Sequence, residues 1–274
     1  MRKTQTGNIL LTFMLLTGFL LIRPMAVHAQ KSNTFKVMTY NIHHGNPPDK
    51  PGVIDVDAIA AIIKKHQPDI VALQEVDVNT KRDGHINEIA TIASKAGYKS
   101  FYFAKTIDLE GGQYGIAILS KYPLTNTATH KLPSNSAKEA EPRVLATALV
   151  HLPNNKTIQF GSTHLDAYHS DNRLLQIKEI IRLTGKSPYP FVIGGDFNSK
   201  ESSEVIKLLD QTFTRTCHQC APTFHEEASA DGAIDYLAFR PAGSLKVISH
   251  QVLKAENASD HYPLVSVLAF EDKK

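Results

Sequence analysis

Residues 191–198 read FVIGGDFN, an apolar run that ends directly in Asp196 and Asn198. Three other runs have the same form: residues 37–41 (VMTYN) end in Asn41, 70–75 (IVALQE) end in Glu75 and 158–164 (IQFGSTH) end in His164. One polar strand ending is ordinary, because strands lead into surface loops. Buried strands are rigid, so four such endings predict one functional site above the strand ends of an α/β protein.

Helical and strand-like segments alternate around these four runs. Residues 54–66 have apolar side chains at helical spacing and end before Pro68, as an amphipathic helix should. Further helices are predicted at 86–96, 170–184 and 202–209, and further strands at 98–104, 115–120, 143–151, 234–239 and 262–270. Strands 143–151 and 157–164 are expected to pair as a hairpin around Pro153-Asn154-Asn155. The mixture predicts α/β class, with two packed mixed β-sheets flanked by helices.

The first 29 residues have the form of a cleaved signal peptide. Arg2 and Lys3 precede an apolar run over 9–22, and 27–29 (VHA) supply small residues before a cleavage site at Gln30. An uncleaved membrane anchor is the alternative, but the run is shorter than the roughly 20 residues that span a bilayer. We therefore expect export to the periplasm or the medium, and a mature single domain of residues 30–274, monomeric and not inserted in a membrane.

Removal of this leader changes the charge balance. The whole chain has 30 Lys and Arg residues against 27 Asp and Glu residues, and the leader holds three basic residues and no acidic one. The mature chain is therefore neutral when its histidines are uncharged. Proteins that bind long stretches of nucleic acid usually have a basic surface, so this balance disfavours extended duplex binding without excluding a short basic patch.

The two cysteines, Cys217 and Cys220, have the spacing C-x-x-C. In an exported chain this spacing favours a local disulfide. A zinc site that adds His218 and His225 is a weaker alternative, because structural zinc sites normally use two separated ligand pairs. A redox motif is weaker still, because no strand and helix flank the pair in the required order.

The polar residues at the strand ends are of types suited to acid/base and metal chemistry. Glu75 is a natural ligand for a hard cation such as Mg²⁺. His261 follows Asp260 directly, and Asp235 offers a second carboxylate that could orient the imidazole. His164 would bring a second imidazole to the same site, an arrangement that suits phosphoester hydrolysis.

Each of these residues also has an ordinary interpretation. Glu75 could be a surface strand end, Asn198 could cap the helix that starts near Ser202, and His261 could belong to a surface ion pair. Most of the 13 histidines must be ordinary. His43 and His44 are counted among them, although they lie near Asn41 and could meet a substrate.

The motifs follow the order that they have in the endonuclease/exonuclease/phosphatase superfamily, and the chain resembles that family over nearly all of its mature length. The motifs are Tyr40-Asn41-Ile42, Leu73-Gln74-Glu75, Tyr114-Gly115, residues 119–123 (LSKYP), Glu141-Pro142-Arg143, Thr163-His164-Leu165, residues 195–198 (GDFN), Ile234-Asp235-Tyr236 and Ser259-Asp260-His261.

The resemblance implies a DNase I-like four-layered sandwich and metal-dependent hydrolysis of phosphoester bonds. It also implies roles for the matching residues. Glu75, Asn41 and Asp260 would bind Mg²⁺, for which Mn²⁺ could substitute. His261, held by Asp235, would act as base or orient the attacking water, and Asp196 and Asn198 would position water and phosphate. His164 would hydrogen-bond a phosphoryl oxygen or act as acid, and Arg143 would clamp the phosphate.

The resemblance leaves the substrate open. The bond cleaved is a phosphodiester or a phosphomonoester. The leader and the neutral mature charge favour a small-molecule or lipid-linked phosphodiester, with a secreted DNase I-like nuclease acting on nucleic acid as the alternative. Gly115 stands where many members have Asn, so one expected contact to phosphate or metal is absent. A binding module without activity is a further alternative that the fold alone would permit. It is disfavoured because every catalytic position keeps a competent residue.

Overall fold

The computed structural model describes residue 1 and residues 33–135, 140–153, 155–225, 232–254 and 256–271. Residues 2–29 of the expected leader, Asn154 of the expected hairpin turn and residues 226–231 lie outside the described residues. In the described part of the chain, no helix is both long enough and apolar enough to cross a membrane.

The strands form two mixed six-stranded sheets, as predicted. In hydrogen-bonding order, the first sheet contains β11 (Leu245–Val252), β12 (Leu264–Phe270), β1 (Thr34–Asn41), β2 (Ile70–Val78), β4 (Gly112–Ser120) and β3 (Ser100–Leu109). The second contains β5 (Leu124–Lys131), β6 (Val144–His151), β7 (Thr157–His164), β8 (Phe191–Asp196), β10 (Asp235–Arg240) and β9 (Thr214–Arg215). The pairs β1–β2 and β7–β8 are parallel and the others antiparallel, which includes the predicted β6–β7 hairpin.

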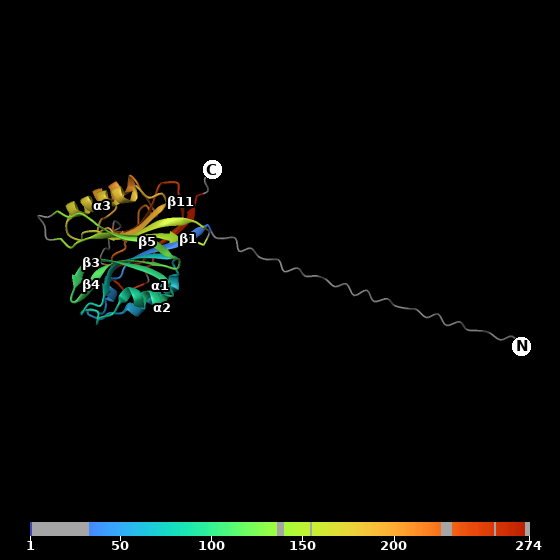
Figure 1. The fold of residues 1–274 in the computed structure, drawn as a ribbon, viewed down its shortest axis with the longest axis horizontal. Helices are drawn as coiled ribbons and strands as arrows, with labels where there is room; N and C mark the ends of the chain where they lie inside the picture. Colours follow the sequence, from blue (N-terminus) through green and yellow to red (C-terminus); the bar gives the residue numbers. More distant parts are fainter. Residues whose placement is uncertain (2–32, 136–139, 154, 226–231, 255, 272–274) are drawn as a thin grey trace. The chain divides into compact units, whose positions relative to one another are not determined.

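Within the described residues, four α-helices cover the outer faces of the sheets. They are α1 (Val56–His66), α2 (Glu88–Ala96), α3 (Ser170–Thr184) and α4 (Glu204–Asp210). Helices α1 and α2 share an apolar cluster with the first sheet, and α3 and α4 share another with the second. Figure 1 shows α1 and α2 together on one side of the strands and α3 on the opposite side. A third apolar cluster fills the space between the sheets, which completes four layers.

The period-two pattern of the central strands explains this layering. In β1, Val37 belongs to the cluster between the sheets, whereas Met38 lies under the helices. In β2, Ala72 likewise belongs to the cluster between the sheets, and Leu73 lies under the helices. Both faces of these strands are therefore buried, which is why they read as continuous apolar runs.

The predicted helices and strands agree best with the structure where the pattern of apolar residues is strongly periodic. Helix α3 has the predicted bounds, and α1 begins at Val56 because the side chain of Asp55 accepts a hydrogen bond from the amide of Ala58. Strands β5, β9 and β11 were not predicted. β5 (LTNTATHK) and β11 are edge strands with many exposed polar residues, and β9 has only two residues, so none has a clear apolar pattern.

The two glycines of the GGD motif lie inside β8. A Cβ atom at Gly194 would lie 3.0 Å from Cβ of Thr39 and 3.1 Å from Cβ of Ala72 in the facing sheet. A Cβ atom at Gly195 would lie 2.4 Å from the carbonyl oxygen of Thr163. Glycine therefore permits the close approach that brings the strand ends of both sheets together.

Candidate active site

The four polar strand endings predicted from the sequence meet at one edge of the sandwich. Asn41 lies between the two sheets: its Nδ2 donates to Glu75 Oε1 at 2.9 Å and to Asp196 Oδ2 at 3.1 Å. His164 pairs in parallel register with Asp196, and its Nε2 lies 3.5 Å from Asp196 Oδ2. Four segments far apart in sequence therefore form one polar cluster.

Glu75 owes its position to a β-bulge. Leu73 pairs with Ala117 and Val76 with Gly115, so that Gln74 and Glu75 together face one residue of β4. Gln74 turns into the core, where its Nε2 donates to Ser162 Oγ of the second sheet at 3.1 Å. Glu75 has a φ of 56°, a strained conformation for a residue with a side chain, and is only partly buried.

Gly115 pairs with Val76 at the end of this bulge. A Cβ atom at Gly115 would lie 2.2 Å from the carbonyl oxygen of Ala104. This backbone therefore has no room for an Asn side chain at position 115.

An Asp–His pair lies beside Asp196. Asp235 starts β10 directly opposite Asp196 in antiparallel register, and its Oδ2 lies 2.8 Å from Nδ1 of His261. Nε2 of His261 lies 3.7 Å from Asp196 Oδ2. The Ser259 hydroxyl donates to the carbonyl oxygen of Asn41 at 2.8 Å, which fixes the Ser259–His261 segment against the end of β1.

Burial and charge give these groups different protonation behaviour. Burial alone would lower the pKa of His261, but the charge and hydrogen bond of Asp235, with the charge of Asp196, raise it to about 10. Burial and the charge of Asp235 raise the pKa of Asp196 to about 7, against the opposing effect of His261. Burial, followed by the charges of Arg143 and His261, lowers the pKa of His164 well below its usual value. One imidazole is thus favoured as a cation and the other as a neutral group.

Asn198 and Arg143 lie at the margin of this cluster. Asn198 donates its backbone amide to Asp196 Oδ1 at 2.8 Å and its Nδ2 to the carbonyl oxygen of Leu165 at 3.1 Å. It does not cap a helix, since Ser203 caps α4. Arg143 is buried and pairs with a Glu141 carboxylate oxygen at 3.0 Å, while its Nε has no hydrogen-bond partner among the described residues.

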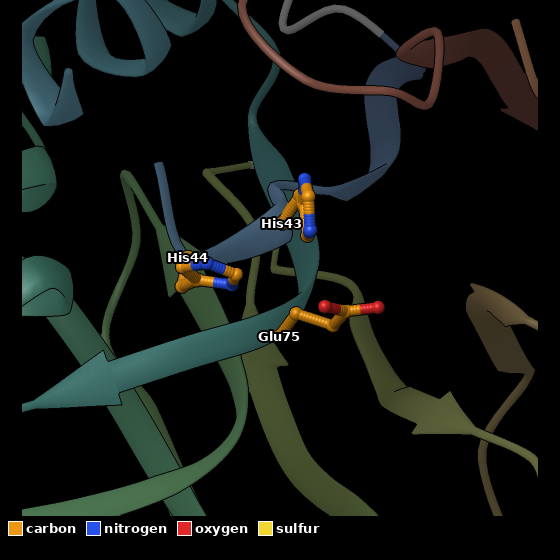
Figure 2. A group of neighbouring side chains, drawn as sticks. All are labelled: His43, His44 and Glu75. Carbon is orange, nitrogen blue, oxygen red and sulfur yellow. The ribbon is translucent and has the colours of Figure 1, made fainter. Parts of the chain in front are cut away.

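Two histidines that the sequence interpretation treated as ordinary also face the site. His43 and His44 lie in the 3₁₀ turn His43–Gly45 that follows β1. One nitrogen of each imidazole and one carboxylate oxygen of Glu75 lie within 4.8 Å of one another, and Figure 2 shows both rings beside that carboxylate. Burial, helped by the charge of Arg82, lowers the pKa of His44 to about 4, so its imidazole is neutral. The sequence signal that could have assigned His43 and His44 to the site was their position two and three residues after Asn41.

Cys217 and Cys220 form the predicted disulfide, with 5.4 Å between their Cα atoms. Both are buried beside the apolar cluster under α3 and α4. The pair thus serves as a local link in the loop that follows β9.

The residues present fit a hard divalent cation on the Glu75 side of the cluster. Glu75 and Asp260 supply carboxylate oxygens that are not fully buried. Asn41 Oδ1 accepts the backbone amide of His43 at 3.1 Å and retains a second lone pair. Oxygen donors of this kind suit Mg²⁺. Asp196, Asp235 and His261 form a second group that could hold an ion, but there the ring of His261 already bonds Asp235.

The four layers define a DNase I-like fold. The model of the endonuclease/exonuclease/phosphatase family matches residues 38–261, and the chain belongs to that family. Members are hydrolases that act on phosphoester bonds, in substrates such as nucleic acids or small phosphates, and generally use a divalent metal ion.

Individual relatives agree with this assignment. The chain is 27% identical to nocturnin of Xenopus laevis over 206 residues, which is 65% of this chain but only 51% of that protein. The crystal structure of an endonuclease/exonuclease/phosphatase from Beutenbergia cavernae has 25% identity and a TM-score of 0.76, and the match covers 87% of this chain and 72% of that one. A mannosyl-6-phosphatase of Bacteroides thetaiotaomicron has the same fold, with 16% identity and a TM-score of 0.71 over 86% of this chain and all of its own.

Proposed function

We propose that the protein is an exported, Mg²⁺-dependent phosphoesterase whose favoured substrate is a phosphodiester in a small molecule or a lipid head group. The observation that carries the proposal is the double contact of Asn41 with Glu75 and Asp196. This contact supports the proposal because it joins Glu75, the carboxylate that would bind the cation, to Asp196, which lies 3.7 Å from Nε2 of His261. Phosphoester hydrolysis needs both cation binding and proton transfer at one phosphorus atom.

The metal ion would be held by Glu75, Asp260 and Oδ1 of Asn41. When bound, it would neutralise charge that develops on the phosphoryl group. Water would form the new bond to phosphorus while the ester oxygen leaves with a proton.

The buried side of the site would handle the water and its proton. Asp196 and Asn198 would position the attacking water, and His261 would exchange a proton with it, since Asp235 fixes its ring at 2.8 Å. His164 and Arg143 would contact the phosphoryl oxygens. The charge of Arg143 reaches His164, which is consistent with both groups facing the same phosphate.

A secreted nuclease is the second candidate, because members of the family also act on nucleic acids. The neutral charge of the expected mature chain favours the smaller substrate, because duplex binding draws most of its affinity from cationic contacts with phosphates.

The test is a comparison of substrates with site variants as controls. The purified protein is assayed with Mg²⁺ on a chromogenic phosphodiester, phosphatidylinositol, sphingomyelin, sugar phosphates, RNA and plasmid DNA. His261→Ala and Asp196→Ala should abolish turnover, whereas His151→Ala, which changes an exposed histidine on β6, should not. Full turnover by either site variant would refute the site, and DNA nicking far faster than all other reactions would refute the substrate preference.

A further inference from the structure

His43, His44 and Glu75 form a cluster that the proposed phosphoester chemistry does not fully use. The two imidazole rings meet edge to face, with centroids 4.5 Å apart and an interplanar angle of 73°. The turn after β1 supplies both rings, and the bulge of β2 supplies the carboxylate (Figure 2). The three potential ligand atoms lie within 4.8 Å of one another.

The hydrogen bonds around His43 leave a nitrogen available for a ligand. Its Nδ1 lies 3.2 Å from the carbonyl oxygen of Asn46. A carbonyl oxygen only accepts, so this bond places the ring hydrogen on Nδ1 and the lone pair on Nε2. A carbonyl that fixes the tautomer in this way is the usual outer contact of a metal-binding histidine.

His44 has an unsatisfied ring nitrogen. Its Nδ1 is buried and has no hydrogen-bond partner among the described residues. A buried polar atom without a partner is costly, and a cation bound by the cluster would remove that cost. The nearby positive charge of Arg82 does not strongly oppose cation binding, because Arg82 donates two hydrogen bonds to the buried carboxylate of Asp77, at 2.6 and 2.8 Å, and its charge is neutralised there.

The backbone is strained at all three positions. The φ angles are 45° at His43, 42° at His44 and 56° at Glu75, all in the left-handed region that residues with side chains rarely adopt. Strain of this kind persists where the fold holds side chains in position for a ligand. Here it directs three side chains from two segments towards one point.

We propose that His43, His44 and Glu75 form a second cation site that selects a divalent transition ion, such as Zn²⁺, over Mg²⁺. Imidazole ligands suit first-row transition ions, whereas Mg²⁺ prefers an all-oxygen shell. Two imidazoles and one carboxylate leave a fourth position open. The site shares Glu75 with the proposed magnesium site, so occupancy of one affects affinity at the other.

The test measures Zn²⁺ binding without turnover, so its outcome is independent of whether the phosphoesterase proposal holds. Protein freed of metal by dialysis against a chelator is titrated with Zn²⁺, and the ligands are identified by X-ray absorption at the zinc edge. Wild-type protein should show two imidazole ligands. The double variant His43→Ala/His44→Ala should raise the Kd at least about 100-fold, since outer-shell partners alone are worth about 10- to 100-fold.

The chain offers a matched control. His85 also has a positive φ, 64°, and its Nδ1 also lies 3.2 Å from a backbone carbonyl oxygen, that of Asn79. His85→Ala should bind Zn²⁺ like the wild type, and Glu75→Gln should weaken binding; circular dichroism checks that each variant is folded. An unchanged Kd in the double variant would overturn the proposal, as would an equal loss in His85→Ala. A zinc shell with a single imidazole would also overturn it, because the proposed site supplies two.

Discussion

The substitution Asp235→Asn tests the core of the proposed chemistry. Asp235 Oδ2 lies 2.8 Å from Nδ1 of His261, and both side chains are buried. The variant keeps the shape of the side chain but removes its charge. Asparagine can also present its NH₂ group to Nδ1, which would favour the wrong tautomer of the imidazole.

The size of the effect follows from the environment of His261. Burial alone would lower its pKa, and Asp235 is the largest of the contributions that raise it to about 10. A neighbouring opposite charge typically shifts a pKa by about 1 to 3, so removal of the charge should lower the pKa of His261 by about 2, which corresponds to about 3 kcal/mol less preference for the imidazolium. A misplaced acid/base group typically costs about 10² to 10⁴ in rate, so kcat/KM should fall by that factor.

Two measurements check this prediction. Hydrolysis of a chromogenic phosphodiester with saturating Mg²⁺ gives kcat/KM, and ¹⁵N NMR of the metal-free protein gives the pKa of His261. Asp57→Asn is the control, because Asp57 forms an exposed ion pair with Lys95 on the surface of α1 and α2, where such pairs contribute little. A variant that keeps kcat/KM within about threefold of the wild type, with the pKa of His261 unchanged, would refute the assigned role.

Three further predictions concern the cation, the buried acid in α2 and the glycines of β8. Chelation by EDTA should abolish hydrolysis and excess Mg²⁺ should restore it; turnover that survives chelation would contradict metal dependence. Burial raises the pKa of Glu88 from 4.5 to about 9, so the unfolded chain loses this proton first and stability falls as pH rises from about 5 to 9. Glu88→Gln should therefore be more stable than wild type by up to about 4 kcal/mol at pH 8 and nearly equal to it at pH 5 in urea unfolding, and an equal difference at both pH values would contradict this. Gly195→Ala should lower stability by about 2 kcal/mol or more and reduce kcat, because its Cβ would lie 2.4 Å from the Thr163 carbonyl oxygen next to Asp196; unfolding and rate measurements that match the wild type would show that β8 can shift without cost.

The sequence predicted the residues that lie at the ends of central strands, and it failed where the backbone departs from regular geometry. Asn41, Glu75, His164 and Asp196 were predictable because parallel buried strands end at one edge. Its place two residues after Asn41 put His43 near the site, but the approach of its ring to Glu75 was not predictable, because the pattern of apolar residues does not report a left-handed φ. The β-bulge that points Glu75 towards Asn41 is equally invisible, since it depends on pairing with β4.

The choice of an amide at position 41 follows from its place between two carboxylates. Its Nδ2 contacts Glu75 Oε1, Asp196 Oδ2 and, at 3.5 Å, Nε2 of His261, but an NH₂ group has only two hydrogens. The two shorter contacts use both, so Asn41 has no hydrogen left for Nε2 of His261, which lies 3.7 Å from Asp196 Oδ2. An aspartate at position 41 would repel both carboxylates, and a lysine would neutralise the negative charge that attracts a cation. Asparagine joins the two sheets while leaving that charge in place, so in the proposed reaction it would couple the residues that hold the cation to the residues that handle the proton.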